Sequence, residues 1–352
     1  MPGGDGQFEL IAEPTINASG HVAVLALLKN TAGGANDDVG ILYYDGINLT
    51  FRARENQPSP DGYLFAFTGY PNLNGLGHVV FPAELKNTPG GANDDFGVYS
   101  SNGVSFLKRA RENDPTPEGN GKFDSFTSEF LFNNAGHVAF QAQLRNTTGG
   151  VNDDSGIYLH NGSNLLAVVR ENDFNPFANG YYSAFGNTGP VMNSLGQVAF
   201  TVRLKGGGVS ALDDRAIFLH GGGTPLIVAR TNALVPEGNG RFRDFEFPLP
   251  VISLNAAGQV AFHAVLSSTA APGVDDSGLY LHNGASIVNR VRENANTPDG
   301  NGRFSAFGVP TLNASGQMAF RADLRGTSGG IGDDKGICDR HSKNVAPGAP
   351  IL

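Results

Sequence analysis

The sequence is short of the residues that build disulfides, aromatic binding platforms and charged surfaces. Its one cysteine, Cys338, rules out both an intrachain disulfide and a cysteine-based zinc site. It has no tryptophan, the side chain on which many glycan-binding proteins rely, although Tyr and Phe can take that role. Charged residues make up only 16%, and the formal net charge of −9 argues against a nucleic-acid or anionic-membrane partner, since either would need a basic face.

Long apolar runs are also missing. The longest, around residues 22–28, is far too short to cross a bilayer, so we expect no membrane span. Residues 1–4 have neither the charged nor the apolar region of a standard secretion signal. Either the chain is not secreted by such a signal, or the signal is not part of this sequence.

What the sequence has instead is a repeat of about 59 residues in six copies. Each copy carries Asn-x-x-Gly, followed 20 residues after the Asn by an Asp-Asp pair. In five copies an Arg follows 17 residues after the first Asp. The Asn-x-x-Gly segments begin at Asn17, Asn74, Asn133, Asn193, Asn255 and Asn313. Only the stretch from the Arg to the next Asn varies in length. Because paired strands cannot gain a residue without turning later side chains to the wrong face, the constant part predicts one sheet.

Within a copy, alternation of apolar and polar residues predicts four strands. Residues 138–144, 156–160 and 165–170 are three of them in the third copy, with an Asn161-Gly162 hairpin turn between the last two. The fourth precedes the Asn and carries paired aromatics such as Phe123 and Phe126. Many short strands and 49 glycines fit this picture.

We therefore predict an all-β chain, a six-bladed β-propeller of four-stranded antiparallel blades. A β-solenoid of the same modules is the alternative. Residues 1–352 would form a single repeat domain, with the last module degenerate after Ile337. The modules run approximately over residues 1–56, 57–113, 114–172, 173–232, 233–294 and 295–352.

One segment of the repeat, in all its copies, resembles a known family. In the third copy it reads Asn133-Asn134-Ala135-Gly136-His137-Val138-Ala139-Phe140. They are similar to bacterial tandem-repeat proteins named for an Asn-x-x-Gly-x-x-Ala-Phe motif, the choice-of-anchor repeat family. The resemblance covers essentially the whole chain, with Val24 and Val80 as departures. It implies an exported bacterial repeat protein, extracellular or at the cell surface, with no particular chemistry. The tail from Ala346 to Leu352 is not a sorting anchor.

The repeated acidic pairs and arginines are the candidate site residues. In an up-and-down blade the Asp-Asp loop and the loop after the Arg lie at the same end, so these charges share one rim. Hard cations take carboxylate oxygens, so calcium is a possible ligand, although we expect no cofactor because no EF-hand-like spacing is present. We favour structural pairing of Asp with Arg. The calcium candidates are Asp37, Asp38, Asp94, Asp95, Asp153, Asp154, Asp213, Asp214, Asp275, Asp276, Asp333 and Asp334. The arginines expected in structural pairs are Arg54, Arg111, Arg170, Arg230 and Arg292.

No catalytic motif is present. His21, His78 and His137 follow the turn glycine, but Gln stands there in the last three copies, which argues against an obligatory metal or catalytic role. We expect a non-enzymatic exported structural or interaction protein. A multivalent lectin or calcium-binding module is the alternative, with a glycan or protein as possible ligand. A metal-dependent hydrolase of propeller type is the second alternative, by fold analogy alone.

The end of the chain predicts self-assembly. The sixth module loses its signature after Ile337, so residues 345–352 either complete the blade or leave an open edge. Unpaired strand edges recruit other strands, and head-to-tail strand donation through the termini would give a homo-oligomer or filament. The rival expectation is that residues 8–11 and the tail close the ring within one chain.

Overall fold

The structure, a computed structural model, describes residues 2–12, 14–126, 130–186, 189–245, 252–330 and 333–340. In these residues nearly all regular structure is β-strand, and the helices are single 3₁₀ turns. They are η1 (Pro2–Gly4), η2 (Gly34–Asn36), η3 (Gly91–Asn93) and η4 (Gly150–Asn152). The described chain contains no helix of the length and apolarity that a membrane crossing requires.

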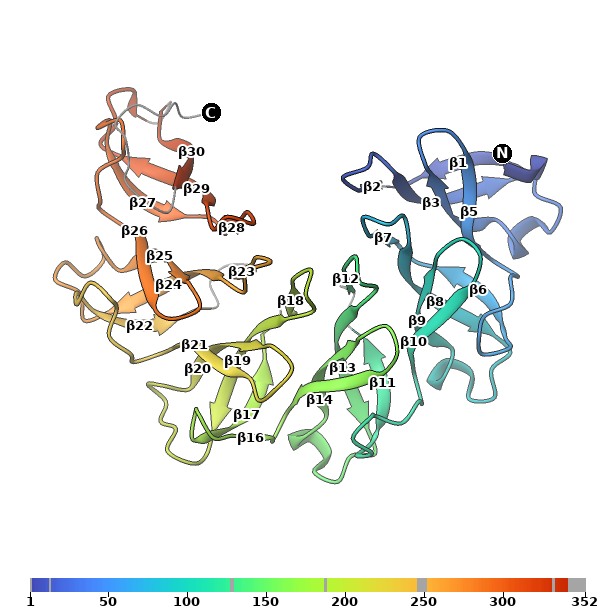
Figure 1. Ribbon diagram of the computed structural model, residues 1–352, viewed down its shortest axis with the longest axis horizontal. Coiled ribbons are helices and arrows are strands. Elements are labelled where there is room, and N and C mark those ends of the chain that lie inside the picture. Colours follow the sequence, from blue (N-terminus) through green and yellow to red (C-terminus); the bar gives the residue numbers. More distant parts are fainter. Residues whose placement is uncertain are drawn as a thin grey trace. The chain divides into compact units, whose positions relative to one another are not determined.

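The strands form six antiparallel sheets, one for each module, which follow one another along the chain in colour order (Figure 1). Sheet 1 contains β1 (Gln7–Ile11), β2 (Thr15–Ile16), β3 (Val22–Lys29), β4 (Val39–Tyr44) and β5 (Leu49–Arg54). Sheet 2 contains β6 (Leu64–Thr68), β7 (Asn72–Leu73), β8 (Val79–Lys86), β9 (Phe96–Ser101) and β10 (Phe106–Arg111). Sheet 3 contains β11 (Lys122–Phe126), β12 (Leu131–Phe132), β13 (Val138–Arg145), β14 (Ser155–His160) and β15 (Leu165–Arg170).

The second half of the chain repeats this plan. Sheet 4 contains β16 (Phe174–Asn175), β17 (Gly180–Phe185), β18 (Val191–Met192), β19 (Val198–Lys205), β20 (Arg215–His220) and β21 (Leu226–Arg230). Sheet 5 contains β22 (Arg241–Asp244), β23 (Ile252–Leu254), β24 (Val260–Ser267), β25 (Ser277–His282) and β26 (Ile287–Arg292). Sheet 6 contains β27 (Arg303–Phe307), β28 (Thr311–Leu312), β29 (Met318–Arg325) and β30 (Lys335–Arg340).

Each sheet takes all its strands from one module. In sheet 1 the order is β1-β3-β4-β5, with β2 paired to the far end of β3. A β-solenoid would instead pair strands of successive repeats into continuous sheets. The predicted fold class, an all-β six-bladed β-propeller with antiparallel blades, is therefore confirmed, and the described sheets have four to six strands where four were predicted, because short strands such as β2 pair with the long strand. The segment predicted to complete the sixth blade, residues 345–352, lies outside the described residues.

The buried faces follow the alternation predicted from sequence. On β13, Val138, Phe140, Ala142 and Leu144 are buried, while Gln143 is exposed. The strand that carries the paired aromatics adds its side chains to this buried face. In sheet 3 the ring centres of Phe123 and Tyr158 lie 4.9 Å apart, in an edge-to-face contact. Equivalent edge-to-face pairs recur in sheets 2, 4 and 5. These clusters form the aromatic face of each sheet.

The chain divides into two compact units, Met1–Val169 and Arg170–Leu352, and each is described by itself. In the first unit, the aromatic face of sheet 2 packs on Ala23, Ile41 and Ala53 of sheet 1. The aromatic face of sheet 3 packs on sheet 2 in the same way. In the second unit, sheet 5 packs on sheet 4 and sheet 6 packs on sheet 5. The hydrophobic cores therefore lie between sheets, so each blade depends on its neighbour for stability.

Candidate functional site

The repeated Arg and the first Asp of the acidic pair meet within the same module. Nε of Arg111 donates to the Asp94 carbonyl oxygen at 2.6 Å, and its Nη2 lies 3.2 Å from the Asp94 carboxylate. The pair is largely buried, since the two side chains are 10% and 9% exposed. The same ion pair links Arg54 to Asp37 at 3.3 Å, Arg230 to Asp213 at 3.0 Å and Arg292 to Asp275 at 3.9 Å. Arg170 ends β15 and is 3% exposed.

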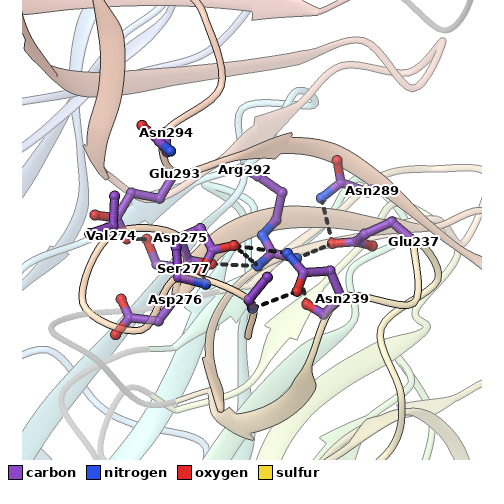
Figure 2. Close-up of polar contacts among 12 residues, drawn as sticks. Glu237, Asn239, Val274, Asp275, Asp276, Ser277, Asn289, Arg292, Glu293 and Asn294 are labelled. Atoms are coloured by element: carbon purple, nitrogen blue, oxygen red, sulfur yellow. Dashed lines mark hydrogen bonds and ion pairs between the residues drawn. The ribbon is translucent and has the colours of Figure 1, made fainter. Parts of the chain in front are cut away.

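A second acid joins this pair from the loop that precedes the aromatic strand. In the fifth module, Nη1 of Arg292 lies 2.6 Å from Oε1 of Glu237, which also accepts from the Tyr280 hydroxyl at 2.8 Å. Asn239 donates to the Asp275 carboxylate at 2.8 Å. Figure 2 shows Arg292 between Asp275 and Glu237, with Asn239 beside both. The guanidinium is thus neutralised by two carboxylates and held by two loops.

Sequence reasoning missed this loop, although it carries a signal. Glu237 belongs to a Glu-Gly-Asn-Gly segment that recurs with small changes just before each aromatic pair. In the second module Asp61 takes its place, 3.7 Å from Arg111 and 3.1 Å from Lys108. In the first module Asp5 lies 2.8 Å from Arg54.

The second Asp of each pair acts through its backbone. Its carbonyl oxygen accepts from the amide of a leucine near the end of the preceding long strand, at 2.6–2.7 Å in all six modules. The acceptors are Asp38, Asp95, Asp154, Asp214, Asp276 and Asp334. Asp153 accepts from Asn120 at 2.9 Å, and Asp333 accepts from Asn301 at 2.7 Å. The described residues contain no group of three or more acidic, His or Cys side chains placed to hold a metal ion.

The Glu that follows the repeated Arg is a titratable group of the same rim. Burial, followed by the charges of the nearby Asp95 and Asp124 carboxylates, raises the pKa of Glu112 to about 7. Burial, followed by the adjacent Asp of the acidic pair, also raises the pKa of Glu55 and Glu293. These carboxyls therefore carry protons at higher pH than exposed glutamates do.

A basic residue from the following sheet faces this Glu. Arg325, at the end of β29, lies 3.9 Å from Glu293 and donates to the Val274 carbonyl at 2.9 Å. Lys205 lies 3.9 Å from Glu171 in the same relation. In the fourth module Thr231 replaces the Glu, and Ser267 of the following module replaces the basic residue. The two positions change together within one chain, which indicates that they act as a pair.

The opposite end of the sheets is linked by the asparagines of the Asn-x-x-Gly turns. Nδ2 of Asn17 donates to the Asn74 carbonyl at 2.9 Å, and Nδ2 of Asn74 donates to the Asn133 carbonyl at 3.0 Å. In the second unit, Asn193 and Asn255 donate to the next turn at 2.9 and 3.0 Å. We call this series the asparagine ladder. The sequence identified these residues as turn formers only, because a link between turns leaves no trace in a local pattern.

A shallow surface hollow lies beside the ladder in the first unit. Its volume is about 350 Å³, and the strands β2, β7 and β12 contribute to it. Its lining combines aromatic, apolar and amide groups: Thr15, Tyr70, Pro71, Asn72, Val80, Phe130 and Leu131. Tyr70 is 67% exposed, so its ring is available to a ligand.

Comparison with protein families finds one match, over residues 2–343, described as "Family of unknown function (DUF7453)". Comparison with curated proteins finds no match. Among solved structures, the chain is similar to the β-propeller domain of the Trilobed protease from Pyrococcus furiosus, with 8% identity, 96% of this chain and 84% of that chain covered, and a TM-score of 0.46. It is also similar to an α-L-arabinanase from Penicillium chrysogenum, with 11% identity, coverage of 93% and 91%, and a TM-score of 0.35. A third is the Aleuria aurantia lectin, with 8% identity, coverage of 95% and 96%, and a TM-score of 0.30.

Proposed function

The chain belongs to the family of unknown function DUF7453, and we propose that it is a non-enzymatic structural or interaction protein, exported from a bacterium. The observation that carries the proposal is the mutual pairing of its recurring charges. Arg54, Arg111, Arg230 and Arg292 are engaged by acids of their own modules. Charges used in this way hold loops together and are not free for acid–base chemistry or metal binding. Export is supported by the resemblance of the repeat to exported bacterial proteins.

The test is a panel of chromogenic glycosides, esters and phosphate esters, assayed with the full chain and with added divalent metal ions. We expect no turnover above buffer with any substrate. Turnover that survives repurification and is lost with a single substitution would overturn the non-enzymatic assignment. Antibodies against the chain, used on fractions of the source bacterium, should detect it outside the cytoplasm.

A second candidate function, glycan binding, is favoured by the hollow beside the asparagine ladder. Sugar rings stack on aromatic side chains and take hydrogen bonds from amides, and Tyr70 and Asn72 offer both. A glycan array probed with the chain and with Tyr70→Ala tests this candidate. Signals lost in the variant support it, and an array without signals removes it.

The proposal includes self-association through the first sheet. Phe8 and Ile11 of β1 are 38% and 56% exposed, whereas the equivalent Phe304 and Phe307 of sheet 6 are 0% and 8% exposed. No other described sheet of the first unit covers this face. We propose that a second copy of the chain covers it. Light scattering on the intact chain, on Phe8→Ser and on a chain truncated after Ile337 tests this, and a strictly monomeric intact chain at high concentration would exclude it.

A further inference from the structure

Three arginines occupy a position that the structure distinguishes sharply from the paired ones. Arg52, Arg109 and Arg290 each lie two residues before a paired Arg, where the register between the last two strands of the sheet skips one residue. Each is therefore the extra residue of a β-bulge, a device that redirects a side chain. Among the described residues, none of the three forms an ion pair with a carboxylate.

Arg109 is the most enclosed of the three, at 6% exposed. Its Nε donates to the Ser100 hydroxyl at 2.9 Å, and its Nη1 lies 3.0 Å from Nδ1 of His160 in the next sheet. The amide of Gly162 also reaches Nδ1 of His160, at 3.1 Å. Since a guanidinium and an amide can only donate, Nδ1 of His160 is the acceptor and the imidazole is neutral. Burial, together with the charge of Arg109, lowers the pKa of His160 to about 4.

Two further histidines and a second arginine surround this pair. Burial lowers the pKa of His78 and His137, and the charge of Arg109 lowers both further. Arg52, which also acts on His78, stacks its guanidinium 3.6 Å from the centre of the Tyr43 ring. Nε of Arg52 and Nδ1 of His137 are buried without a hydrogen-bond partner.

Without a bound ligand, this arrangement of side chains lowers the stability of the folded protein. A buried cation without a counter-charge loses hydration that neutral hydroxyl and imidazole partners replace only in part. The chain has an excess of acids, with a net charge of −9, yet none is placed beside Arg52 or Arg109. Two of the buried nitrogens without a hydrogen-bond partner, Nε of Arg52 and Nδ1 of His137, lie in this group of side chains, and others belong to the paired arginines, such as Nε of Arg292. Guanidinium and imidazole groups gathered without an acid are the chemistry that recognises an oxyanion.

We propose that the Asn-x-x-Gly end of sheets 1–3 is a binding site for an oxyanion group, a carboxylate, sulfate or phosphate. Arg109 and Arg52 supply the charge, and His78, His137 and His160 complete the site. The site belongs wholly to the first unit, and it goes beyond the scaffold role because it assigns a ligand class to a particular place. The sequence did not reveal the site, since glutamine replaces His78 and His137 in the second unit, which argued against an obligatory metal or catalytic role at that position.

The site should be coupled to proton binding. The groups that face it are Arg52 from sheet 1, His78 and Arg109 from sheet 2, and His137 and His160 from sheet 3, with His21 beside Tyr43 at the edge. A bound anion favours the imidazolium form of His78 and His137, so binding takes up protons. Affinity therefore increases as the pH falls from 7.5 to 5.5.

Isothermal titration calorimetry on the full chain at low salt tests the proposal with three probes: inorganic sulfate, inorganic phosphate and glucuronate. The three probes separate tetrahedral anions from a sugar carboxylate. We expect saturable binding of at least one probe, stronger at pH 5.5 than at pH 7.5. Arg109→Gln should weaken it at least tenfold. The matched control is Arg321→Gln, which removes one charge from a side chain that is 64% exposed, and it should bind as the parent does.

Two results would overturn the proposal: no saturable binding of any probe by the parent, or equal binding by the parent and Arg109→Gln. If Arg109→Gln does not fold, Arg52→Gln and NMR of the parent histidines decide the question. The probe must then shift the imidazole signals of His137 and His160 while those of His263 and His282, in the second unit, stay in place. Unchanged imidazole signals under saturating probe would also overturn it.

Discussion

The carboxylate of Glu293 lies 3.9 Å from the guanidinium of Arg325, although the two residues belong to modules on either side of a blade boundary. The fourth and fifth modules replace this pair by Thr231 and Ser267. A charge removed on one side of the boundary is therefore accompanied by removal of the opposite charge on the other. At each boundary between blades the chain therefore has either both charged residues of this contact or neither.

The first prediction concerns this contact. Glu293→Thr and Arg325→Ser, made singly, should each destabilise the chain, because each leaves one charge without its partner. The double variant reproduces the Thr231 and Ser267 combination and should lose less than the sum of the singles. Because Arg325 is 36% exposed, we expect a coupling of about 1 kcal/mol or less. Urea unfolding of the four proteins measures it, and strict additivity would contradict the pairing.

The second prediction concerns the Arg–Asp pair within a module. Arg111→Ala leaves Asp94 buried without its counter-charge, so we expect a loss of about 3–5 kcal/mol. The control is Arg321→Ala, whose pair with Asp323 is 64% and 42% exposed, with an expected loss of about 1 kcal/mol or less. Thermal and urea unfolding check both values. Equal effects at the two positions would refute a structural role for Arg111.

The third prediction concerns pH. The folded chain holds a proton on Glu112 up to about pH 7, while the unfolded chain releases it near the ordinary value of 4.5. Folding therefore binds a proton between these values, and this contribution to stability is lost as the pH rises through 7. Glu112→Gln keeps the neutral form at every pH. It should match the parent near pH 4.5 and unfold at higher urea than the parent at pH 8; parallel pH profiles for the two proteins would argue against the raised pKa.

The fourth prediction concerns the asparagine ladder. Asn74 is 3% exposed, donates to the Asn133 carbonyl, and accepts from the amides of Leu76 and His78. Asn74→Ala should cost about 2–3 kcal/mol, since it leaves buried groups without partners. Asn74→Asp keeps the acceptor oxygen and removes the donor, so it isolates the contact between blades. An Asp variant as stable as the parent would show that only the turn matters.

The fold was predictable because the same residue pattern occurs in every copy of the repeat. The apolar positions of the strand that contains Phe140 recur in all six copies, and the constant spacing from Asn17 to Asp37 to Arg54 fixes a sheet of known length. The Asp–Arg contacts were also within reach, because both residues recur at the same end of an up-and-down blade. Contacts with the loop before the aromatic strand, such as Glu237 with Arg292, were not, because they depend on how a loop of variable sequence folds back.

The contacts between blades were the hardest to foresee. The partner of Asn74 is a backbone carbonyl 59 residues away, and a carbonyl has no sequence signature. Arg109 was missed for another reason: it lies in a bulge, where the simple alternation of a strand fails. Strict period-two counting therefore places this side chain incorrectly.

The asparagine ladder has a consequence for how such chains change over generations. Each rung joins a side chain of one copy to the backbone of the next, and the backbone is the same whichever copy follows. Recombination between two repeats of the gene can thus delete or duplicate a whole copy, and the asparagine at the new junction still meets a carbonyl. The number of copies can therefore change at the genetic level while the hydrogen bond from each asparagine to the next turn is preserved.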